Sequence, residues 1–514
     1  MCRTPDADAA MQQKLPASSE AQDPVRRLLL RQGLGAGALM LAGCVSAPSG
    51  RPRTPPRLPP SERACAERLG WGIDAATALR WHERGRRRMI ASLLRPASGE
   101  GLPAPVQARL EAMSIVTMGP LARLQQIEQL RRSEDRQAAN RRLDELHREA
   151  VDRTLLLALH SPHGVRERMT WFWSNHFSVA AAKSNLRALV GDHEQALRER
   201  ALGRFEDLLQ AATFQPAMLR YLDNESSAAG RLNENHAREL LELHTLGVDG
   251  GYTQRDVQEL ARVLSGLGLS LAEPGQLPKM KPAQQPQHWR DGLAEFNPAR
   301  HDDGDKTLLG RRLAGGRGRE EIVEALRLLA RHPATARHLC TKLALFWLGV
   351  PGSAGLIERL GRRFLDEDGA IAPVLALLFA DPEFEASLGR RFKEPLLYVV
   401  SAARLAGESV PVLDTAPLWS ALGRLGQRPF GRQTPDGYPL DEASWAGAGQ
   451  MVARFDVARA LARAFAAPPR PVALLDETGQ LLPLGERSRG VLDQVRTPQE
   501  RNALLLSAPE FMRG

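Results

Sequence analysis

The feature that most constrains the fold of this chain is a helical spacing of apolar residues, which continues from Glu62 almost to the C-terminus. Apolar side chains recur at intervals of three and four residues, which places them on one face of an α-helix. Strict alternation with β-branched residues, the pattern of strands, is almost absent. The clearest helical stretches are 121–130, 143–159, 322–329 and 371–379. We therefore predict an all-α protein with one large multi-helix globular body over residues 62–510.

Proline and glycine mark the joints between the expected helices, for example at Pro162-His163-Gly164 and from Gly247 to Gly251. The polar, proline-rich stretch 273–287 predicts a long loop, and such loops in compact domains are often functional. No internal repeat period is visible, which argues against a solenoid. From about residue 411 the pattern also allows a looser C-terminal lobe.

Composition places the chain among soluble globular proteins and bounds its partners. Apolar residues make up 43% and charged residues 25% of the 514 residues, enough to build a core. The net charge is +9, but arginine is scattered through helices that also carry Glu and Asp. Nucleic-acid-binding proteins usually concentrate positive charge on one face. We therefore expect no nucleic-acid partner.

The first 43 residues have the organisation of an export signal. Arg26 and Arg27 precede a short apolar, glycine-rich run at 33–43, which resembles a twin-arginine signal. Val25 departs from the Ser or Thr usual before the arginines. The apolar run is much shorter than the roughly 20 residues that span a bilayer. We therefore expect a signal peptide rather than a transmembrane helix.

The signal ends at a lipoprotein cleavage motif, Leu41-Ala42-Gly43-Cys44. Small residues before the cysteine admit the peptidase, and the Cys44 thiol accepts the diacylglyceryl group. Residues 44–61 are rich in proline and predict a semi-rigid tether. The sequence thus predicts a protein anchored to a membrane through lipid on Cys44 and facing the periplasm. Because Val45 rather than Asp follows the cysteine, the outer membrane is favoured over the inner one.

Two cysteines remain in the mature body, Cys65 and Cys340. An oxidising compartment would allow one disulfide between them. Two separate buried thiols fit the sequence equally well, and both alternatives stay open.

The stretch 166–177 holds the first candidate site residues, Asn175 and His176. It reads as an aromatic-rich helix that ends in Asn-His. Taken alone, it favours side chains that cap the last turn of a core helix. A catalytic or metal-binding imidazole is the alternative.

The stretch 233–247 is the richest in chemically capable groups. At 100° per residue, Asn235, Arg238, Glu239 and Glu242 share one helical face. This face could be a solvated surface with an Arg238–Glu242 ion pair. Alternatively, the two carboxylates could bind a cation or act as acid and base. His244 points elsewhere on a regular helix and joins this face only if the helix ends nearby.

Three further stretches contain polar groups at turns. Thr253 and Asp256 fit a capping box, with Tyr252 just before it. The acidic loop 301–306 offers His301, Asp302 and Lys306 as metal-binding or acid–base groups, although an ordinary surface turn looks the same. His332 before Pro333 is expected to be an N-cap.

These stretches together resemble the bacterial "domain of unknown function 1800" family. The matching segments follow the family's order at 168–177, 233–266, 301–310, 332–344 and 425–431, with the later Gly437, Trp445 and Arg454. The resemblance implies an exported, largely helical protein without an assigned activity. Genes of this family often neighbour those of a second uncharacterised family that resembles sulfatases.

The resemblance further implies that polar residues of several segments form one shared centre. These are Asn175, His176, Asn233, Asn235, Arg238, Glu239, Glu242, His244, Thr245, Gly251, Tyr252, Thr253, Asp256, His301, Asp302, Gly304 and Lys306. The chain departs from the family at His236, where Tyr or Phe is usual, and at 265–267, where Thr-Gly-Trp is typical. His236 is therefore not counted as a family ligand.

Two hypotheses for function follow. In the first, the protein is a hydrolase of the cell envelope, in which carboxylates and imidazoles converge on one accessible point. Its catalytic candidates are His176, Glu239, Glu242, His301 and Asp302, supported by Asn175, Asn235, Arg238, Tyr252 and Lys306. A divalent metal, if it is the cofactor, would be held by His176, Glu239, Glu242, His244 and His301. In the second, the protein is a non-catalytic scaffold or a binding partner of the sulfatase-like neighbour, and the same groups form a buried polar network.

Overall fold

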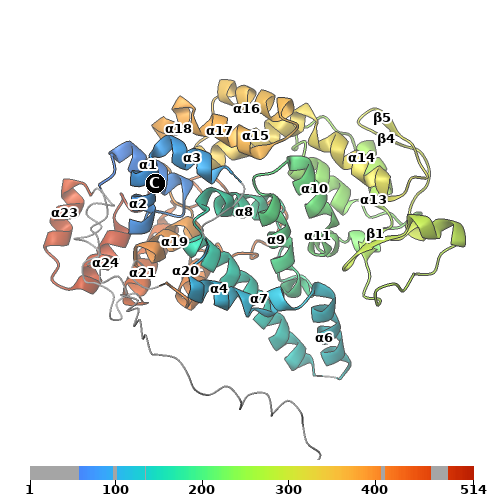
Figure 1. Ribbon diagram of the computed structural model, residues 1–514, viewed down its shortest axis with the longest axis horizontal. Helices are drawn as coiled ribbons and strands as arrows, with labels where there is room; N and C mark the ends of the chain where they lie inside the picture. The colour runs from blue at the N-terminus through green and yellow to red at the C-terminus, as the bar shows by residue number, and fades with distance from the viewer. Residues whose placement is uncertain (1–56, 96–100, 134, 407–410, 465–483) are drawn as a thin grey trace, which may run out of the picture. The chain divides into compact units, whose positions relative to one another are not determined.

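A computed structural model describes residues 57–95, 101–133, 135–406, 411–464 and 484–514 (Figure 1). Residues from Thr54 to Gly514 group into one compact unit, and the described part of it is mostly helical. The predicted signal peptide, Cys44 and most of the tether lie outside the described residues. Within the described ranges, no helix is both long and apolar enough to cross a membrane.

Helices form most of the first half of the described chain. They are α1 (Pro60–Leu69), α2 (Ala75–Arg84), α3 (Arg86–Leu93), α4 (Ala104–Glu111), α5 (Ser114–Thr117), α6 (Pro120–Arg132), α7 (Arg136–His160), α8 (Gly164–His176), η2 (Leu186–Ala188), α9 (Val190–Arg200), α10 (Phe205–Phe214), α11 (Pro216–Tyr221), η3 (Asn224–Ser226), α12 (Asn235–Glu239), the π-helical turn η4 (Leu240–His244) and α13 (Gln254–Leu264).

Short strands and 3-10 turns follow, and then helices resume. These elements are β1 (Leu267–Leu269), η5 (Pro282–Gln287), β2 (Trp289–Asp291), β3 (Ala294–Phe296), η6 (Pro298–Arg300), β4 (Lys306–Leu308), β5 (Arg311–Leu313), α14 (Arg319–Ala330), α15 (Pro333–Leu348), α16 (Ala354–Asp366), α17 (Ile371–Phe379), α18 (Pro382–Ser387), α19 (Pro395–Ala406), α20 (Ala416–Arg424), α21 (Ala448–Ala464), α23 (Glu486–Asp493) and α24 (Pro498–Ser507).

The predicted helical body is confirmed in its main feature. Each of the four clearest helical stretches lies within one helix, namely α6, α7, α14 and α17. The body begins slightly earlier than predicted, because α1 starts at Pro60 inside the expected tether. Proline at the first helical position needs no N–H bond and already has the helical φ angle.

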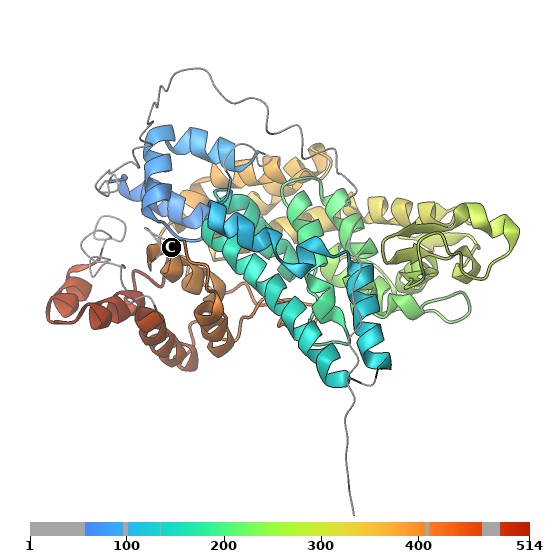
Figure 2. The same ribbon diagram turned by 60° about the horizontal axis from the view of Figure 1, so that its bottom comes forward.

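The all-α prediction needs one correction, because two small sheets follow α13. Strands β1, β3 and β2 form an antiparallel sheet in that spatial order, and β4 and β5 form a hairpin. Each strand has only three residues, which is too short to produce a recognisable alternating pattern. In Figure 2 the sheets lie beyond α13 and α14, at the end of the unit away from α24.

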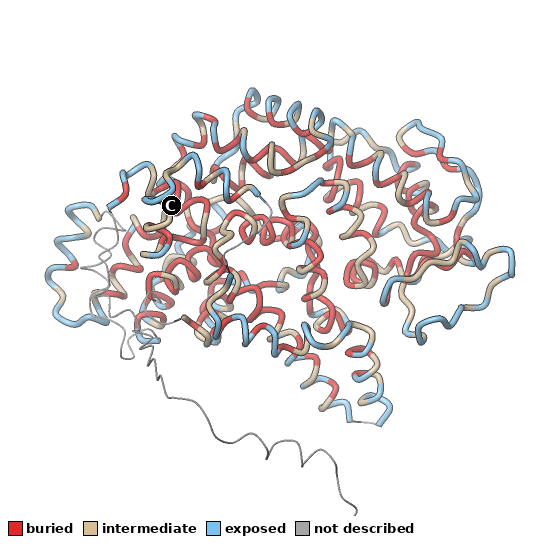
Figure 3. Tube along the Cα trace, in the orientation of Figure 1, coloured by how far each residue is buried: buried red, intermediate tan, exposed pale blue. Residues whose placement is uncertain are grey.

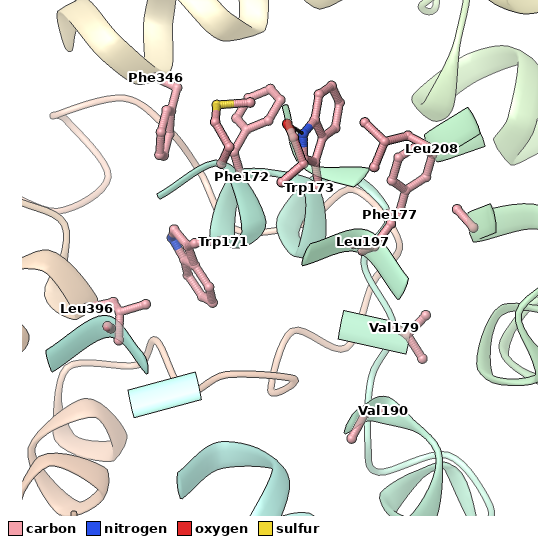
Figure 4. Packing of buried hydrophobic residues seen from close by; sticks show 14 of the residues in the cluster. Trp171, Phe172, Trp173, Phe177, Val179, Val190, Leu197, Leu208, Phe346 and Leu396 are labelled. Carbon is pink, nitrogen blue, oxygen red and sulfur yellow. Dashed lines mark hydrogen bonds between the residues drawn. The ribbon is translucent and has the colours of Figure 1, made fainter. Parts of the chain in front are cut away.

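The core is built around α8, whose apolar and aromatic side chains are buried on almost every side (Figure 3). Helices α7 and α9 pack against it. Trp171, Phe172 and Trp173 are all less than 10% exposed, and Phe346 of α15 packs against Phe172 (Figure 4). A helix buried on almost every side must be covered by neighbours. The polar residues at its C-terminal end, Asn175 and His176, are therefore buried as well.

The two cysteines of the body are separate, buried thiols. Burial raises the pKa of Cys65 to about 11 and that of Cys340 to about 12. A thiol with a raised pKa is a poor nucleophile and a poor metal ligand at neutral pH. Of the two alternatives that the sequence left open, the structure has two separate thiols and not a disulfide.

Candidate acid–base site

The site begins at the end of α8, where His176 uses both of its ring nitrogens. Its Nε2 donates a hydrogen bond to the carbonyl oxygen of His244, at 3.1 Å, and its Nδ1 accepts one from Nζ of Lys342, at 2.9 Å. This pattern requires a neutral ring with the proton on Nε2. Burial lowers the pKa of His176 well below its usual value, and the charge of Lys342 lowers it further.

The carbonyl groups that His176 and a second histidine bind belong to the π-helical turn η4. The last carbonyls of a helix have no partner within the helix. Here His176 binds the carbonyl of His244, and Nε2 of His338 binds that of Leu243, at 3.2 Å. Thr245 closes the turn by donating its hydroxyl to the carbonyl of Leu240, at 2.5 Å. Two imidazoles from α8 and α15 thus fix this end of the helix.

Gly247 allows this close approach. Its φ angle is +84°, and a Cβ atom built on it would lie 2.8 Å from Nδ1 of His338. Glycine alone adopts such a φ angle at no steric cost and leaves room for the imidazole. The predicted end of the helix near Gly247 is therefore confirmed, and it brings His244 next to His176, with ring centroids 6.0 Å apart.

Lys342 on α15 is half-buried, and burial lowers its pKa to about 8, against an opposing contribution from Asp436. Its one hydrogen bond to a described residue goes to His176. Because the neutral imidazole accepts only one N–H, the remaining donors of the ammonium are available to another group. A lysine with a lowered pKa is a stronger acid than an ordinary one.

Asp436 reaches the site on a loop that is clamped to the end of α8. The side-chain amide of Asn175 donates to the carbonyl oxygen of Tyr438, at 2.9 Å, and accepts from its backbone N–H, at 2.6 Å. Gly437 has a φ angle of +76°, and an added Cβ would lie 2.2 Å from the carbonyl oxygen of Asn175. Only glycine fits this contact. Asn175 thus fixes this loop against the end of α8.

The carboxylate of Asp436 is 52% exposed and is paired with Arg432, at 2.7 Å. Burial by itself would raise the pKa of Asp436, but hydrogen bonds from Arg432 and Thr434 hold that pKa below its usual value. Asp436 raises the pKa of Lys342 and that of Glu239, so it lies within electrostatic range of both groups. Asp436 is therefore the most exposed of the charged groups described so far in this site.

Glu239 and Glu242 form the acidic part of the site. Both are half-buried, and burial raises the pKa of Glu239, with the charge of Glu242 adding to the effect. The hydroxyl of Tyr252 donates to Glu242, at 3.4 Å. Burial raises the pKa of Tyr221 to about 12, and the negative charges of Asp436 and Glu239 add to this effect. A carboxyl with a raised pKa is a stronger base once it is ionised.

The other residues predicted for the polar face of this helix have structural partners. Arg238 pairs with Glu234, at 3.2 Å, and with Gln254, not with Glu242 as the regular helix predicted. The reason is that the π-helical turn begins at Leu240 and changes the angular spacing beyond it. Asn235 is exposed; its backbone N–H donates to the side-chain oxygen of Asn233, at 2.9 Å, and its side-chain amide donates to the carbonyl oxygen of Leu222, at 3.4 Å.

His301, Asp302 and Lys306 belong to a different network. Buried Lys306 and His301 both contact the carboxylate of Glu321, and Nδ1 of His301 lies 2.8 Å from the carbonyl oxygen of Ser265. Asp302 forms an ion pair with Arg262, at 2.9 Å. In the described residues, no hydrogen bond or ion pair joins this network to His176, Glu239 or Glu242. The single shared centre is therefore not assembled, because His301 is fully paired elsewhere.

The predicted metal-binding set is likewise not assembled. Among the described residues, no group of three or more His, Cys, Asp or Glu side chains has a geometry that could hold a metal ion. Both nitrogens of His176 already have partners, and His301 lies in the other network. These residues do not fit a resident metal, and we assign no role to one.

Several residues of the site were missed in the sequence. Lys342 and His338 lie in the stretch 332–344, for which the sequence predicted only the N-cap His332. That cap is confirmed, because His332 accepts a hydrogen bond from the backbone N–H of Ala334. Asp436 directly precedes Gly437, which was noted only as a family residue. The available signal for Lys342 was its place directly before the apolar run 343–348 and four residues after His338, on the same face of the expected helix.

A ring of further buried histidines surrounds His244. Burial lowers the pKa of His193 and His338 to about 4 and that of His236 to about 3. Both ring nitrogens of His236 are buried, with no hydrogen-bond partner in the described part of the chain. These imidazoles are neutral at physiological pH, so they add no positive charge beside Lys342.

Comparisons with known proteins identify the family but no function. Residues 64–513 match the family model described as "Protein of unknown function (DUF1800)". Neither a curated protein nor a solved structure matches the chain. Since the match covers nearly the whole described body, the chain belongs to the DUF1800 family.

Proposed function

We propose that this protein is an exported, lipid-anchored hydrolase of the cell envelope, with Glu239 as general base and Lys342 as general acid. The observation that carries the proposal is the contact of Nζ of Lys342 with Nδ1 of His176, at 2.9 Å, with the carboxylate of Asp436 in electrostatic range of both Lys342 and Glu239. Perturbed acid–base groups that gather at an accessible place are typical of active sites.

The protonation states at neutral pH support these roles. The raised pKa of Glu239 makes its ionised carboxylate a better base, which removes a proton from the attacking water. The pKa of Lys342, about 8, leaves most of it as an ammonium at pH 7, able to protonate the leaving group. One proton enters Glu239 and one leaves Lys342, so exchange of both groups with solvent restores the starting state.

The surrounding residues position these two groups. Neutral His176 holds one N–H of Lys342 without repelling its charge. Asp436 balances that charge from the exposed side, and Tyr252 holds Glu242 through its hydroxyl. None of these residues needs to contact the reacting bond, so we describe them as positioning residues.

The test uses the mature chain and an envelope fraction purified from the source cells. Mass spectrometry measures the soluble products released by the wild type, Glu239→Gln and Lys342→Arg. Removal of a general acid or base is expected to slow release by about 10²–10⁴-fold. Arg keeps the positive charge but cannot give up a proton near neutral pH. Glu199→Gln, an exposed carboxylate outside the site, is the matched control.

Equal release by the wild type and both site variants would contradict the proposed roles of Glu239 and Lys342. Absence of any release would favour the non-catalytic alternative, in which the protein is a scaffold or binds a partner such as the sulfatase-like neighbour. The anchor is tested separately with Cys44→Ser. That variant is expected to lose the mass of the lipid and to move from the membrane to the soluble fraction.

A further inference from the structure

Two clefts that share no lining residue with the acid–base site meet at a single arginine, Arg319, the first residue of α14. One cleft, of about 810 Å³, is lined by α10, the start of α11 and the turn between β2 and β3. The other, of about 820 Å³, is lined by α14 and the end of the β4–β5 hairpin. Arg319 lines both, so the two clefts adjoin there, and we refer to them together as the groove.

The first cleft has the chemistry of a sugar-binding surface. Trp289 and Phe214 are half-buried, with ring centroids 5.4 Å apart, and present aromatic carbon to the cleft. Hydrogen-bonding groups surround the rings, namely the side chains of Asp207, Gln210, Gln215 and Asp291. Aromatic rings pack against the C–H faces of sugars, and a few fixed amides and carboxylates bind their hydroxyls.

The second cleft is rich in arginine. Six arginines line it, against two glutamates, Glu320 and Glu324; they are Arg311, Arg312, Arg317, Arg319, Arg327 and Arg331. Four of these arginines form ion pairs with carboxylates, those of Glu206, Asp305, Glu324 and Asp368. These arginines are 39–73% exposed, and such pairs are weak enough to exchange for a ligand.

Arg311 and Arg319 are different, because no hydrogen bond or ion pair joins their guanidinium groups to another described residue. The guanidinium carbon of Arg319 lies 4.9 Å from the ring centroid of Trp289. A guanidinium donates paired N–H groups that match sulfate, phosphate and carboxylate. An anionic group held by Arg319 would therefore be next to a sugar packed on the aromatic residues.

We propose that this groove binds an anionic polysaccharide. The uncharged part of a sugar unit contacts Trp289 and Phe214, and its anionic substituent contacts Arg319 and Arg311. A nucleic acid fits less well, because Asp207 and Asp291 in the first cleft repel a continuous phosphate backbone. The groove shares no lining residue with the acid–base site, so the two proposals can fail separately.

The test measures binding of fluorescently labelled dextran sulfate to the mature chain at about 0.15 M salt, where exposed charges are largely screened beyond ~8 Å. Uncharged dextran of the same length is the matched polymer, and dextran phosphate and polygalacturonate compare the anionic groups. We expect dextran sulfate to bind at least tenfold more tightly than dextran. Trp289→Ala and Arg319→Gln should each weaken binding at least tenfold, and Trp289→Phe should bind at an intermediate level.

Arg362→Gln is the control for general charge, since Arg362 is 65% exposed on α16 and, among the residues that the structure describes, pairs only with Glu358. Thermal unfolding of each variant shows whether it is folded. An equal loss in Arg362→Gln and Arg319→Gln would overturn the proposal, because binding would then follow net charge alone. Unchanged binding by folded Trp289→Ala and Trp289→Phe, or equal affinity for a single-stranded oligonucleotide, would overturn it too.

Discussion

Nζ of Lys342 donates a hydrogen bond to Nδ1 of His176, at 2.9 Å, across a separation of 166 residues. The opposite nitrogen of the same ring donates to the backbone of the π-helical turn, so the imidazole cannot rotate or change tautomer without losing a bond. The lysine is thereby held in one place beside the carboxylates of the site. An ammonium so held differs from an ordinary surface lysine in both its pKa and its mobility.

The first prediction concerns the pKa of Lys342. NMR titration of mature protein labelled at the lysine side chains should show one lysine that titrates near pH 8, and Lys342→Arg should remove that signal. In Asp436→Asn the pKa of Lys342 should fall below 8, because the aspartate stabilises the ammonium form. The rate of hydrolysis should decrease as the pH rises through the same value. A lysine signal that titrates above pH 10 in the wild type would contradict this assignment.

The second prediction concerns stability in acid. Burial lowers the pKa of His236 from its ordinary value of 6.5 to about 3 in the folded protein. Between pH 6.5 and pH 3, the imidazole therefore binds a proton only in the unfolded chain. Stability should therefore fall as the pH decreases below 6.5. The contribution of His236 to this loss is about 2 kcal/mol in the free energy of unfolding between pH 8 and pH 5, and His236→Phe should remove it. Urea unfolding at both pH values measures it.

The control for this prediction is His82→Phe, since His82 is exposed on α2. It should leave the pH dependence of unfolding unchanged. If His236→Phe gave the same change in stability at pH 5 and pH 8, protonation of the unfolded chain would not be its cause.

The third prediction concerns the clamp between Asn175 and Tyr438. Gly437→Ala should destabilise the protein by about 1–3 kcal/mol, because alanine is strained at a φ angle of +76° and its Cβ meets Asn175. Gly447→Ala, where no atom lies within 4 Å, should have little effect. The loop that carries Asp436 should also shift, and the pKa of Lys342 should then decrease as in Asp436→Asn. Urea unfolding and the lysine titration measure both effects, and unchanged values would show that the loop is placed by other contacts.

The fourth prediction separates the second polar network from catalysis. Glu321 is fully buried, and bonds from His301, Lys306 and the backbone of Arg317 overcome the effect of burial and lower its pKa to about 2. Its stabilising effect should be complete above pH 4.5 and disappear as the pH falls toward 2. Glu321→Gln should cost about 3–5 kcal/mol, because Lys306 stays buried without its counterion.

The matched control is Glu320→Gln, the exposed neighbour on the same helix. The pH dependence of hydrolysis should be the same in the wild type and in folded Glu321→Gln. A shift in that pH dependence would show that His301 and its partners do take part in catalysis.

The sequence was sufficient to predict the helices, because their apolar period is local and repeats several times in each. It also led to Glu239 and Glu242, which share one helix, and to His176 at a helix end. It did not lead to Lys342 or Asp436, since their roles depend on contacts between segments more than 90 residues apart. It wrongly added His301, because a polar loop looks the same whether its histidine binds a ligand or a buried glutamate.

The π-helical turn also restricts how the length of this segment can change. Removal of a single residue between Leu240 and His244 would let the turn become a regular α-helix. The chain beyond it would keep nearly the same direction, because a π-helical turn holds one residue more than the α-helical turn that would replace it. Loss of a residue from α12 would instead rotate everything after it by about 100°, and the carbonyls bound by His176 and His338 would lose their alignment with α8 and α15. Related proteins that keep this site should therefore tolerate a one-residue deletion in the turn far better than one in α12.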